Sequence, residues 1–396
     1  MPASSARSTQ GPFCLWQGTD LPTWIRLMKY RPPMSWTHSV RIGLAAMSAV
    51  NNTFLAGLEK LCYSRKIEQT HVPDPVFILG HWRSGTTLLH NLMARDPQFA
   101  TPNMYQVLFP HHFLLTEHVI GPLTSWLLPK TRPMDDVAVN WSAPQEDELA
   151  ICILSLLSPY LMTCVHHRDD VFEDHLDLLS LSEKQRRYWK QTLLGFLKKV
   201  MIRNPGRQLL LKSPSHTFRI RTLLELFPRA RFVHIVRNPY RVNLSGMHLR
   251  RCLYPENSFS QPDFSRVEQQ VLNVYEHCFD CFERDRGLLQ PNQLVELRLE
   301  DLEQDILGEL GRVYSGLSLS GYDEVAESIR PQLSNLQKYR KNKFEIQPEH
   351  QRQIYNRCRD VFERYGYESD LEDETTPTAD SSSMSSRRER MTVPAA

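Results

Sequence analysis

Residues 75–95 constrain the fold of this chain more than any other stretch. Their sequence is Pro-Val-Phe-Ile-Leu-Gly-His-Trp-Arg-Ser-Gly-Thr-Thr-Leu-Leu-His-Asn-Leu-Met-Ala-Arg. The continuous apolar run at 76–79, bounded by Pro75 and Gly80, predicts a strand that is buried on both faces, as in a parallel sheet. The leucines and methionine that follow have the spacing of one helical face. The turn at 80–87 therefore leads from a strand into a helix, and the free backbone N–H groups of such a turn favour an anion.

The spelling of this turn is close to the Gly-x-x-x-x-Gly-Lys-Ser/Thr phosphate loop, but the lysine is missing. Gly80 and Gly85 have the required separation, and Thr86 and Thr87 follow. A nucleoside triphosphatase places the lysine of this motif on its β- and γ-phosphates. With Thr86 in its place and Arg83 inside the loop, we expect the turn to hold a different phosphate-like group.

Two further apolar runs end in a basic residue. Residues 208–212 end in Lys212 and residues 231–236 are followed by Arg237, and each run precedes a helix start that contains proline. The carboxyl ends of parallel strands are the edge where α/β sheets bind ligands. A fourth run, 293–297, is also followed by a helical pattern. This alternation predicts an α/β, P-loop-like fold of three layers, in which helices flank a central parallel sheet.

The chain outside this alternation suggests three additions. Residues 1–70 are expected to form an N-terminal helical extension before the main domain at 71–370, which contains a helical insertion at about 99–206. The tail at 371–396 is Ser-rich and charged, and we expect it to be disordered. In the extension, an apolar stripe is expected to pack on the main domain, and it comprises Ile42, Ala45, Ala46, Val50, Phe54, Leu58 and Leu61.

The loop Arg83-Ser84-Gly85-Thr86-Thr87 resembles the Lys/Arg-Ser-Gly-Thr-Thr loop of the sulfotransferases that use 3′-phosphoadenosine 5′-phosphosulfate (PAPS), in their broad, mainly bacterial-type branch. That family binds the 3′-phosphate with an arginine at a strand end and a serine eight positions later, which correspond here to Arg237 and Ser245. The resemblance covers about residues 74–367. It implies that PAPS is the co-substrate and that these residues bind it.

Two basic residues resemble the late cofactor loop of the family only faintly. Arg340 and Lys341 lie in a basic run, but the glycine expected beside them is absent. They are therefore either part of a loop that covers the cofactor or part of a solvated face.

Catalysis of sulfuryl transfer requires positive groups and a base. Arg83 and Lys212 would stabilise charge on the bridging oxygen and the sulfuryl group. Glu146, Glu148 and His216 are alternative bases for the acceptor proton, and the sequence does not choose between them. The two glutamates also suit the start of a predicted helix, where carboxylates are favourable. His216 stands four positions after Lys212, whereas the lysine and histidine of cytosolic sulfotransferases are two positions apart.

No metal is expected in this reaction. The strand at 231–236 is followed by Arg237, where an ATPase would have the aspartate that holds Mg²⁺. The alternatives to a sulfotransferase are a P-loop kinase or nucleoside triphosphatase, and a non-catalytic nucleotide-binding protein on the same scaffold. The acceptor is an unidentified hydroxyl or amine of a small molecule, a lipid or a saccharide.

Composition limits the partners and the compartment. A net charge of +2 argues against a nucleic-acid binder. Eight scattered cysteines fit a reducing compartment, so a cytoplasmic location is expected, and the close pair Cys278 and Cys281 is expected to pack in the core. No signal peptide or membrane-spanning segment is predicted. Residues 107–128 are expected to form a hydrophobic lid or a buried helical pair, with a peripheral membrane contact as the alternative, and the oligomeric state stays open.

Overall fold

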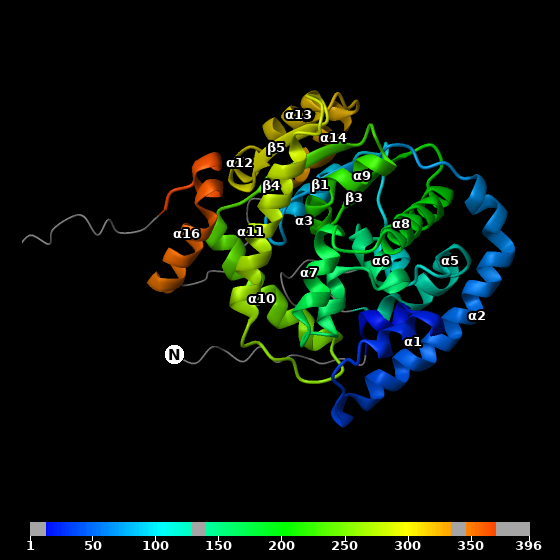
Figure 1. Cartoon of the computed structure of the whole chain (residues 1–396). Helices are drawn as coiled ribbons and strands as arrows, with labels where there is room; N and C mark the ends of the chain where they lie inside the picture. Colours follow the sequence, from blue (N-terminus) through cyan, green and yellow to red (C-terminus); the bar gives the residue numbers. More distant parts are fainter. Residues whose placement is uncertain (1–12, 129–139, 334–345, 370–396) are drawn as a thin grey trace, which may run out of the picture.

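A computed structural model describes residues 13–128, 140–333 and 346–369 (Figure 1). The predicted disordered tail at 371–396 lies outside these residues, as do Arg340 and Lys341.

Five parallel strands form the sheet, in the order β2-β3-β1-β4-β5. Their bounds are β1 Val76–Leu79, β2 Phe99–Ala100, β3 Gln208–Lys212, β4 Arg231–Val236 and β5 Leu294–Arg298. The bounds of β1, β3 and β4 agree with the apolar runs of the sequence, and β5 is displaced by one residue. The prediction missed β2, because a strand of two residues is too short to show a pattern. The central strand β1 is paired on both sides, so its carboxyl end lies between those of β3 and β4.

Alternate residues of the strands face two separate apolar cores, which makes the molecule three-layered. On one face, Phe77, Leu211 and Phe232 pack with residues of α6 (Asp147–Ser155), α8 (Glu183–Arg203) and α9 (Ile220–Leu226). On the other, Ile78, Leu210 and Val233 pack with α3 (Thr86–Met93), α13 (Ile306–Gly316) and α14 (Tyr322–Ile329). The predicted α/β class with a central parallel sheet is confirmed.

The other helices surround this core. Beside β4, three of them pack together, α10 (Pro239–Asn257), α11 (Val267–Arg286) and α16 (Pro348–Tyr365). Helix α12 (Leu299–Gln304) follows β5 directly. Between β2 and β3 the described chain is helical and includes α4 (Met104–Leu108), α5 (Phe113–Thr124), the 3₁₀ turn η3 (Ser125–Leu127), the 3₁₀ turn η4 (Pro159–Thr163) and α7 (Asp169–Asp177). A further 3₁₀ turn, η5 (Pro214–Phe218), follows β3.

The stretch at 107–128 is buried at its start and exposed at its end. Val107, Phe113 and Leu114 lie in the core, whereas Leu123 and Trp126 are exposed. Among the described residues, no helix combines the length and the apolar character that crossing a bilayer requires.

The N-terminal part comprises η1 (Leu15–Gly18), α1 (Leu21–Lys29), η2 (Trp36–His38) and the long helix α2 (Ser39–Gln69). Trp16, Trp24 and Leu27 bury η1 and α1 against residues of α6, η4 and the turn after α10. Helix α2 differs from the prediction. Ile42, Ala45 and Ala46 at the start of its apolar stripe pack against residues of α6 and η4, as expected. The rest of the stripe, Val50, Phe54, Leu58 and Leu61, is exposed, so the expectation was wrong for this second half. The buried face of α2 includes polar Arg41, Asn52 and Glu59, which bind groups on neighbouring segments.

Candidate active site

The turn after β1 has a strained and closely packed backbone. Three of its residues have positive φ: Gly80 (144°), Arg83 (71°) and Gly85 (102°). A Cβ on Gly80 would lie 2.5 Å from the Ile235 carbonyl oxygen, and one on Gly85 would lie 2.6 Å from Leu299 Cδ1. The turn therefore fits between the end of β4 and the start of α12 only with glycine at these two positions. Arg83 holds a left-handed conformation that is unfavourable for a side-chain-bearing residue, as often found at functional sites.

The same turn is fastened at its start and open at its end. The Gly80 N–H donates to Thr217 Oγ1 at 2.8 Å, and the Ser84 N–H donates to the His81 carbonyl at 3.2 Å. Gly85, the residue before α3, makes no side-chain cap, so the first N–H groups of this helix point into the turn. Ser84 Oγ is buried and has no hydrogen-bond partner among the described residues. Uncapped N–H groups and an orphaned hydroxyl are suited to an anion.

Arg237 and Ser245 both contact this turn. Arg237, directly after β4, donates from Nη1 to the Arg83 carbonyl at 3.2 Å, and Arg83 Nε donates to Ser245 Oγ at 2.9 Å. Burial lowers the pKa of the Arg237 guanidinium, Glu300 opposes this change, and Arg83 adds to it. The two halves of the predicted cofactor signature thus share one edge of the sheet, and a single ligand can reach both.

Lys212 ends the strand on the other side of β1, where it pairs with Ile78. Its Nζ lies 2.6 Å from Glu146 Oε1, and the lysine and glutamate side chains are 3% and 16% exposed. The Tyr160 hydroxyl donates to Glu146 Oε2, and Trp82 Nε1 donates to the Tyr160 hydroxyl at 2.9 Å. Burial, reinforced by Glu146, raises the pKa of Tyr160 well above its usual value, so this phenol stays a donor. A chain of contacts therefore joins the turn to the ends of β3 and α6.

The next two acidic residues lie in fully buried contacts. Asp147 accepts from Ser213 Oγ at 2.7 Å, and its other oxygen lies 2.8 Å from His216 Nε2. Both side chains of the Asp147–His216 pair are 0% exposed. Although burial acts to raise the pKa of Asp147, His216 and Ser213 together hold it below its usual value. Asp147 therefore stays ionised and fixes the imidazole in the core.

Glu148 is held in the same way by the segment after β3. It accepts from Ser215 Oγ at 2.7 Å and from Arg219 Nη1 at 2.6 Å, and the Glu148–Arg219 pair is also 0% exposed. Of the three predicted bases, Glu146, Glu148 and His216, only Glu146 keeps exposed surface next to Lys212.

Sequence reasoning missed three residues of this arrangement: Trp82, Tyr160 and Arg219. Trp82 lies inside the recognised loop, so its position was a signal that went unused. Tyr160 and Arg219 have no signal in the sequence, because their partners lie 14 and 71 positions away and only the tertiary fold brings them together.

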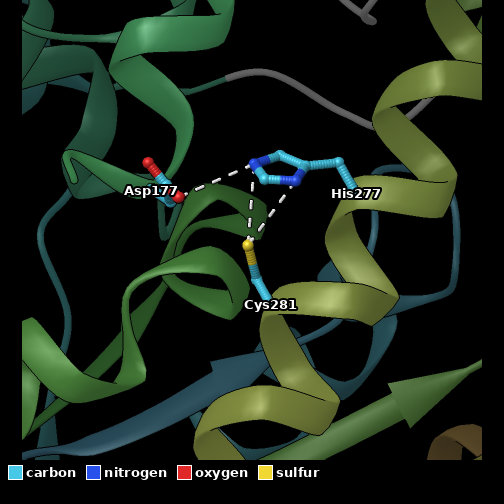
Figure 2. A group of neighbouring side chains, drawn as sticks. All are labelled: Asp177, His277 and Cys281. Carbon is cyan, nitrogen blue, oxygen red and sulfur yellow. Dashed lines mark hydrogen bonds and ion pairs between the residues drawn. The ribbon is translucent and has the colours of Figure 1, made fainter. Parts of the chain in front are cut away.

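The cysteine pair on α11 separates into two environments. Cys278 is buried against Leu176, Phe218 and Val274. Cys281 Sγ lies 3.6 Å from His277 Nε2, which in turn lies 3.8 Å from Asp177 Oδ2 (Figure 2).

These three side chains could in principle ligate a cation. However, Arg284 Nη1 already lies 3.6 Å from the same Asp177 oxygen and supplies positive charge there. Burial also raises the pKa of Cys281 to about 12, so in the absence of a cation its thiol is neutral. This geometry favours packing, as the sequence suggested.

An α/β sheet with a glycine-containing turn after its central strand, and basic groups at the ends of both neighbouring strands, is an arrangement suited to an anionic ligand at the carboxyl edge of the sheet. The comparisons with known proteins specify the class of protein. The profile of the sulfotransferase family matches residues 75–324, so the chain belongs to this family and is a sulfotransferase.

The relatives agree with this assignment. The chain is 36% identical over 358 residues to the omega-hydroxy-beta-dihydromenaquinone-9 sulfotransferases Stf3 of Mycobacterium bovis and Mycobacterium tuberculosis, covering 89% of this chain and 91% of each relative. The fold is similar to that of sulfotransferase STF9 from Mycobacterium avium, with a TM-score of 0.64 at 16% identity, over 90% of this chain and 97% of that one. It is also similar to STF1 from Mycobacterium tuberculosis H37Rv, with a TM-score of 0.57 at 15% identity, over 84% and 89% of the two chains.

Proposed function

We propose that this sulfotransferase binds PAPS across the turn after β1 and transfers its sulfuryl group to a hydroxyl of an apolar, quinone-type lipid. The observation that carries the donor half is the direct contact of Arg237 and Ser245 with the backbone and side chain of Arg83. Two anion-binding groups in contact suit a donor that carries a phosphate at one end and a phosphosulfate at the other.

The turn supplies one half of the donor site. The N–H groups of Gly85, Thr86 and Thr87 and the threonine hydroxyls would hold the 5′-phosphate. Ser84, whose N–H already donates to the His81 carbonyl, would contribute its orphaned hydroxyl. Arg237 and Ser245 would hold the 3′-phosphate. A guanidinium bond to a phosphate is charge-assisted, with a net value of about 1.5–3 kcal/mol. No divalent cation is needed in this scheme, because Arg83, Lys212 and Arg237 provide the positive charge.

Lys212 and Glu146 would perform the chemistry. PAPS, when bound, supplies the sulfuryl group and leaves as adenosine 3′,5′-bisphosphate. The bond from sulfur to the donor oxygen breaks while a bond from sulfur to the acceptor oxygen forms, and the acceptor proton moves to the Glu146 carboxylate. The Lys212 ammonium and the Arg83 guanidinium stabilise the charge that develops on the donor and sulfuryl oxygens. The Lys212–Glu146 ion pair holds the two side chains next to each other at the end of β3.

Glu148 and His216 would act as positioning residues. Both are fully buried and already bonded, so neither has a free surface for an acceptor. Their bonds join the start of α6 to the segment after β3, and these are the two elements that carry Glu146 and Lys212.

The acceptor half of the proposal rests on the relatives. Both curated relatives are named for a hydroxylated dihydromenaquinone, and the similarity extends over most of each chain. A lipid hydroxyl is therefore better supported than a saccharide or an amine.

The donor site is tested by thermal unfolding with adenosine 3′,5′-bisphosphate in the absence of metal, compared with Mg-ATP. We expect the bisphosphate to stabilise the wild type and to bind Arg237→Ala about 10- to 100-fold more weakly, as expected for one lost charge-assisted bond. Arg241→Ala, at an exposed position on the same helix α10, is the matched control and should bind normally. A preference for Mg-ATP, or equal binding by both variants, would contradict the donor assignment.

The acceptor is tested by mass spectrometry for the gain of one SO₃. An omega-hydroxylated menaquinone, a saccharide and a primary amine are offered with PAPS, and we expect the lipid alone to be sulfated efficiently. Efficient sulfation of the saccharide or the amine instead would contradict the acceptor assignment and leave the donor site untouched.

A further inference from the structure

The outer face of α2 is apolar over most of its length. The exposed side chains are Val40, Met47, Val50, Phe54, Leu58 and Leu61. Their spacings of three, four or seven residues place them on one stripe of the helix. From Val40 to Leu61 the stripe is about 32 Å long at 1.5 Å per residue. Met47, Phe54 and Leu61 are 64%, 66% and 82% exposed, and Trp36, just before α2, is 86% exposed.

Polar contacts on the opposite face fix this orientation. Arg41 donates to the carbonyls of Pro255 and Ser258 at 2.7 and 2.9 Å. Asn52 donates to the Thr19 carbonyl at 2.9 Å, and Glu59 accepts from the Leu114 N–H at 2.8 Å and pairs with Lys199. Turning the apolar stripe inward would break these buried bonds, each of which is costly to lose. These buried bonds therefore keep the apolar stripe facing outward.

This segment is also strongly basic. Residues 21–67 contain a single acidic side chain, Glu59, which is buried and paired with Lys199, and one exposed acidic residue, Glu68, follows at the end of α2. The basic side chains of the same range are Arg26, Lys29, Arg31, Arg41, Lys60, Arg65 and Lys66. Five of them are exposed. Those at positions 29 and 31 precede the stripe, and those at 60, 65 and 66 lie at its end or just after it. Between Arg41 and Glu59 the helix carries no charge at all.

We propose that the outer face of α2 binds the surface of an anionic lipid bilayer, with the helix axis parallel to that surface. Exposed apolar side chains flanked by lysine and arginine are what a membrane-surface helix requires, because the apolar groups enter the interface while the cations meet anionic headgroups. Trp36 at one end suits the same interface. Helix α2 runs along one outer edge of the molecule, where a flat surface can approach it (Figure 1).

The positive charge of the segment favours an anionic bilayer over the main alternative partner, a second copy of the chain. A symmetric dimer through α2 would bring two basic segments together without acidic partners within residues 21–67, and like charges would oppose that contact. An anionic bilayer is attracted by the same charges. The outer face of α2 shares no residue with the proposed donor site. Its binding to a bilayer also does not depend on which acceptor the enzyme uses. If the acceptor is a membrane lipid, the surface would bring enzyme and acceptor together.

The test is flotation of the full-length protein with vesicles of phosphatidylglycerol and phosphatidylcholine in equal parts, compared with phosphatidylcholine alone. We expect binding to the anionic vesicles that weakens with salt. The variant Met47→Ser, Phe54→Ser, Leu61→Ser should lose at least about tenfold in binding, because each serine removes a side chain that would enter the interface. The control Leu179→Ser, Leu288→Ser alters exposed leucines elsewhere and should bind like the wild type.

A second variant tests the charges separately. Lys60→Glu, Arg65→Glu, Lys66→Glu should lose binding to anionic vesicles, whereas Lys184→Glu on α8 should not. Thermal unfolding of all variants should stay at the wild-type midpoint, since the altered side chains are exposed. Unchanged vesicle binding by both triple variants would overturn the proposal. So would a stable dimer of the wild type that the serine variant dissociates, if that dimer shows no affinity for vesicles.

Discussion

Replacing Glu146 with glutamine separates catalysis from folding more sharply than any other change at this site. Glutamine keeps an oxygen that can accept from Tyr160 but cannot take a proton from the acceptor. A lost general base lowers kcat by about 10²- to 10⁴-fold, which is about 3–5 kcal/mol in the barrier. We therefore expect Glu146→Gln to bind adenosine 3′,5′-bisphosphate and to turn over at least about a hundredfold more slowly.

The stability cost of the same change follows from burial. Breaking a buried ion pair costs about 3–5 kcal/mol, whereas an exposed pair is worth about 0–1 kcal/mol. Lys212 is 3% exposed and Glu146 is 16% exposed, so the loss of this pair should cost an intermediate amount, about 2 kcal/mol.

Glu148→Gln is the matched comparison, two residues further along the same helix. Its partner Arg219 is fully buried but keeps a bond of 2.7 Å to the Leu176 carbonyl, so we expect a loss near the lower end of the buried range, about 3 kcal/mol. The amide oxygen of glutamine can still accept from Ser215 and Arg219 and so keep α6 in place, and the enzyme that remains folded should therefore turn over at close to the wild-type kcat.

The assay measures initial rates of bisphosphate release at saturating PAPS, together with denaturant unfolding of each variant. Retention of more than about one tenth of the wild-type kcat by Glu146→Gln would refute its role as the base. Loss of the acidic limb of the pH–rate profile in His216→Asn, with that limb retained in Glu146→Gln, would assign the base to His216 instead.

Two further predictions concern the turn and the pH dependence of folding. Gly80→Ala should lose both stability and bisphosphate binding, because its Cβ would meet the Ile235 carbonyl oxygen at 2.5 Å. The control Gly206→Ala, with φ of 79° and open space around it, should lose only about 1–2 kcal/mol of stability and bind the bisphosphate normally. Equal behaviour of the two variants would show that the turn tolerates a side chain. Burial lowers the pKa of His81 and of His90 to about 3, so between pH 6.5 and 3 the unfolded chain takes up protons that the folded chain excludes. The unfolding free energy of the wild type should therefore fall as the pH drops below 6.5. It should fall less steeply in His90→Gln, and with the wild-type slope in the exposed control His118→Gln. A flat profile in the wild type would contradict this account.

The strands β1, β3 and β4 were predictable because they are almost fully buried. A strand buried on both faces is a continuous apolar run, and punctuation by Pro75, Gly80, Lys212 and Arg237 marks where the runs end. Helix α2 shows the limit of such reasoning. Its apolar period correctly predicted a helix with one apolar face, but a period cannot say what covers that face. The buried bonds of Arg41, Asn52 and Glu59, which decide it, join positions distant in the sequence.

The contact of Arg237 and Ser245 with Arg83, in the proposed donor site, was predictable for a related reason. Its residues lie within one turn or at the ends of adjacent strands, so their spacing along the chain determines their positions in space. The choice between Glu146 and Glu148 was not predictable in this way. Glu146 is the N-cap residue of α6 and has an extended backbone, whereas Glu148 lies in the first turn of the helix. Which of the two faces the site is decided by the packing of α6 on the segment after β3.

In this packing, the positive groups and the proposed base come from different parts of the fold. The positive groups Arg83, Lys212 and Arg237 belong to the turn and strand ends of the sheet, whereas Glu146 begins a helix of the insertion. Asp147 and Glu148 fasten this helix to the end of β3, and the Glu148 N–H also donates to Ser213 Oγ at 3.1 Å. The proposed base is thus placed by its two neighbours in the sequence. An insertion held in this way can change elsewhere in sequence without moving either the proposed base or the proposed donor site.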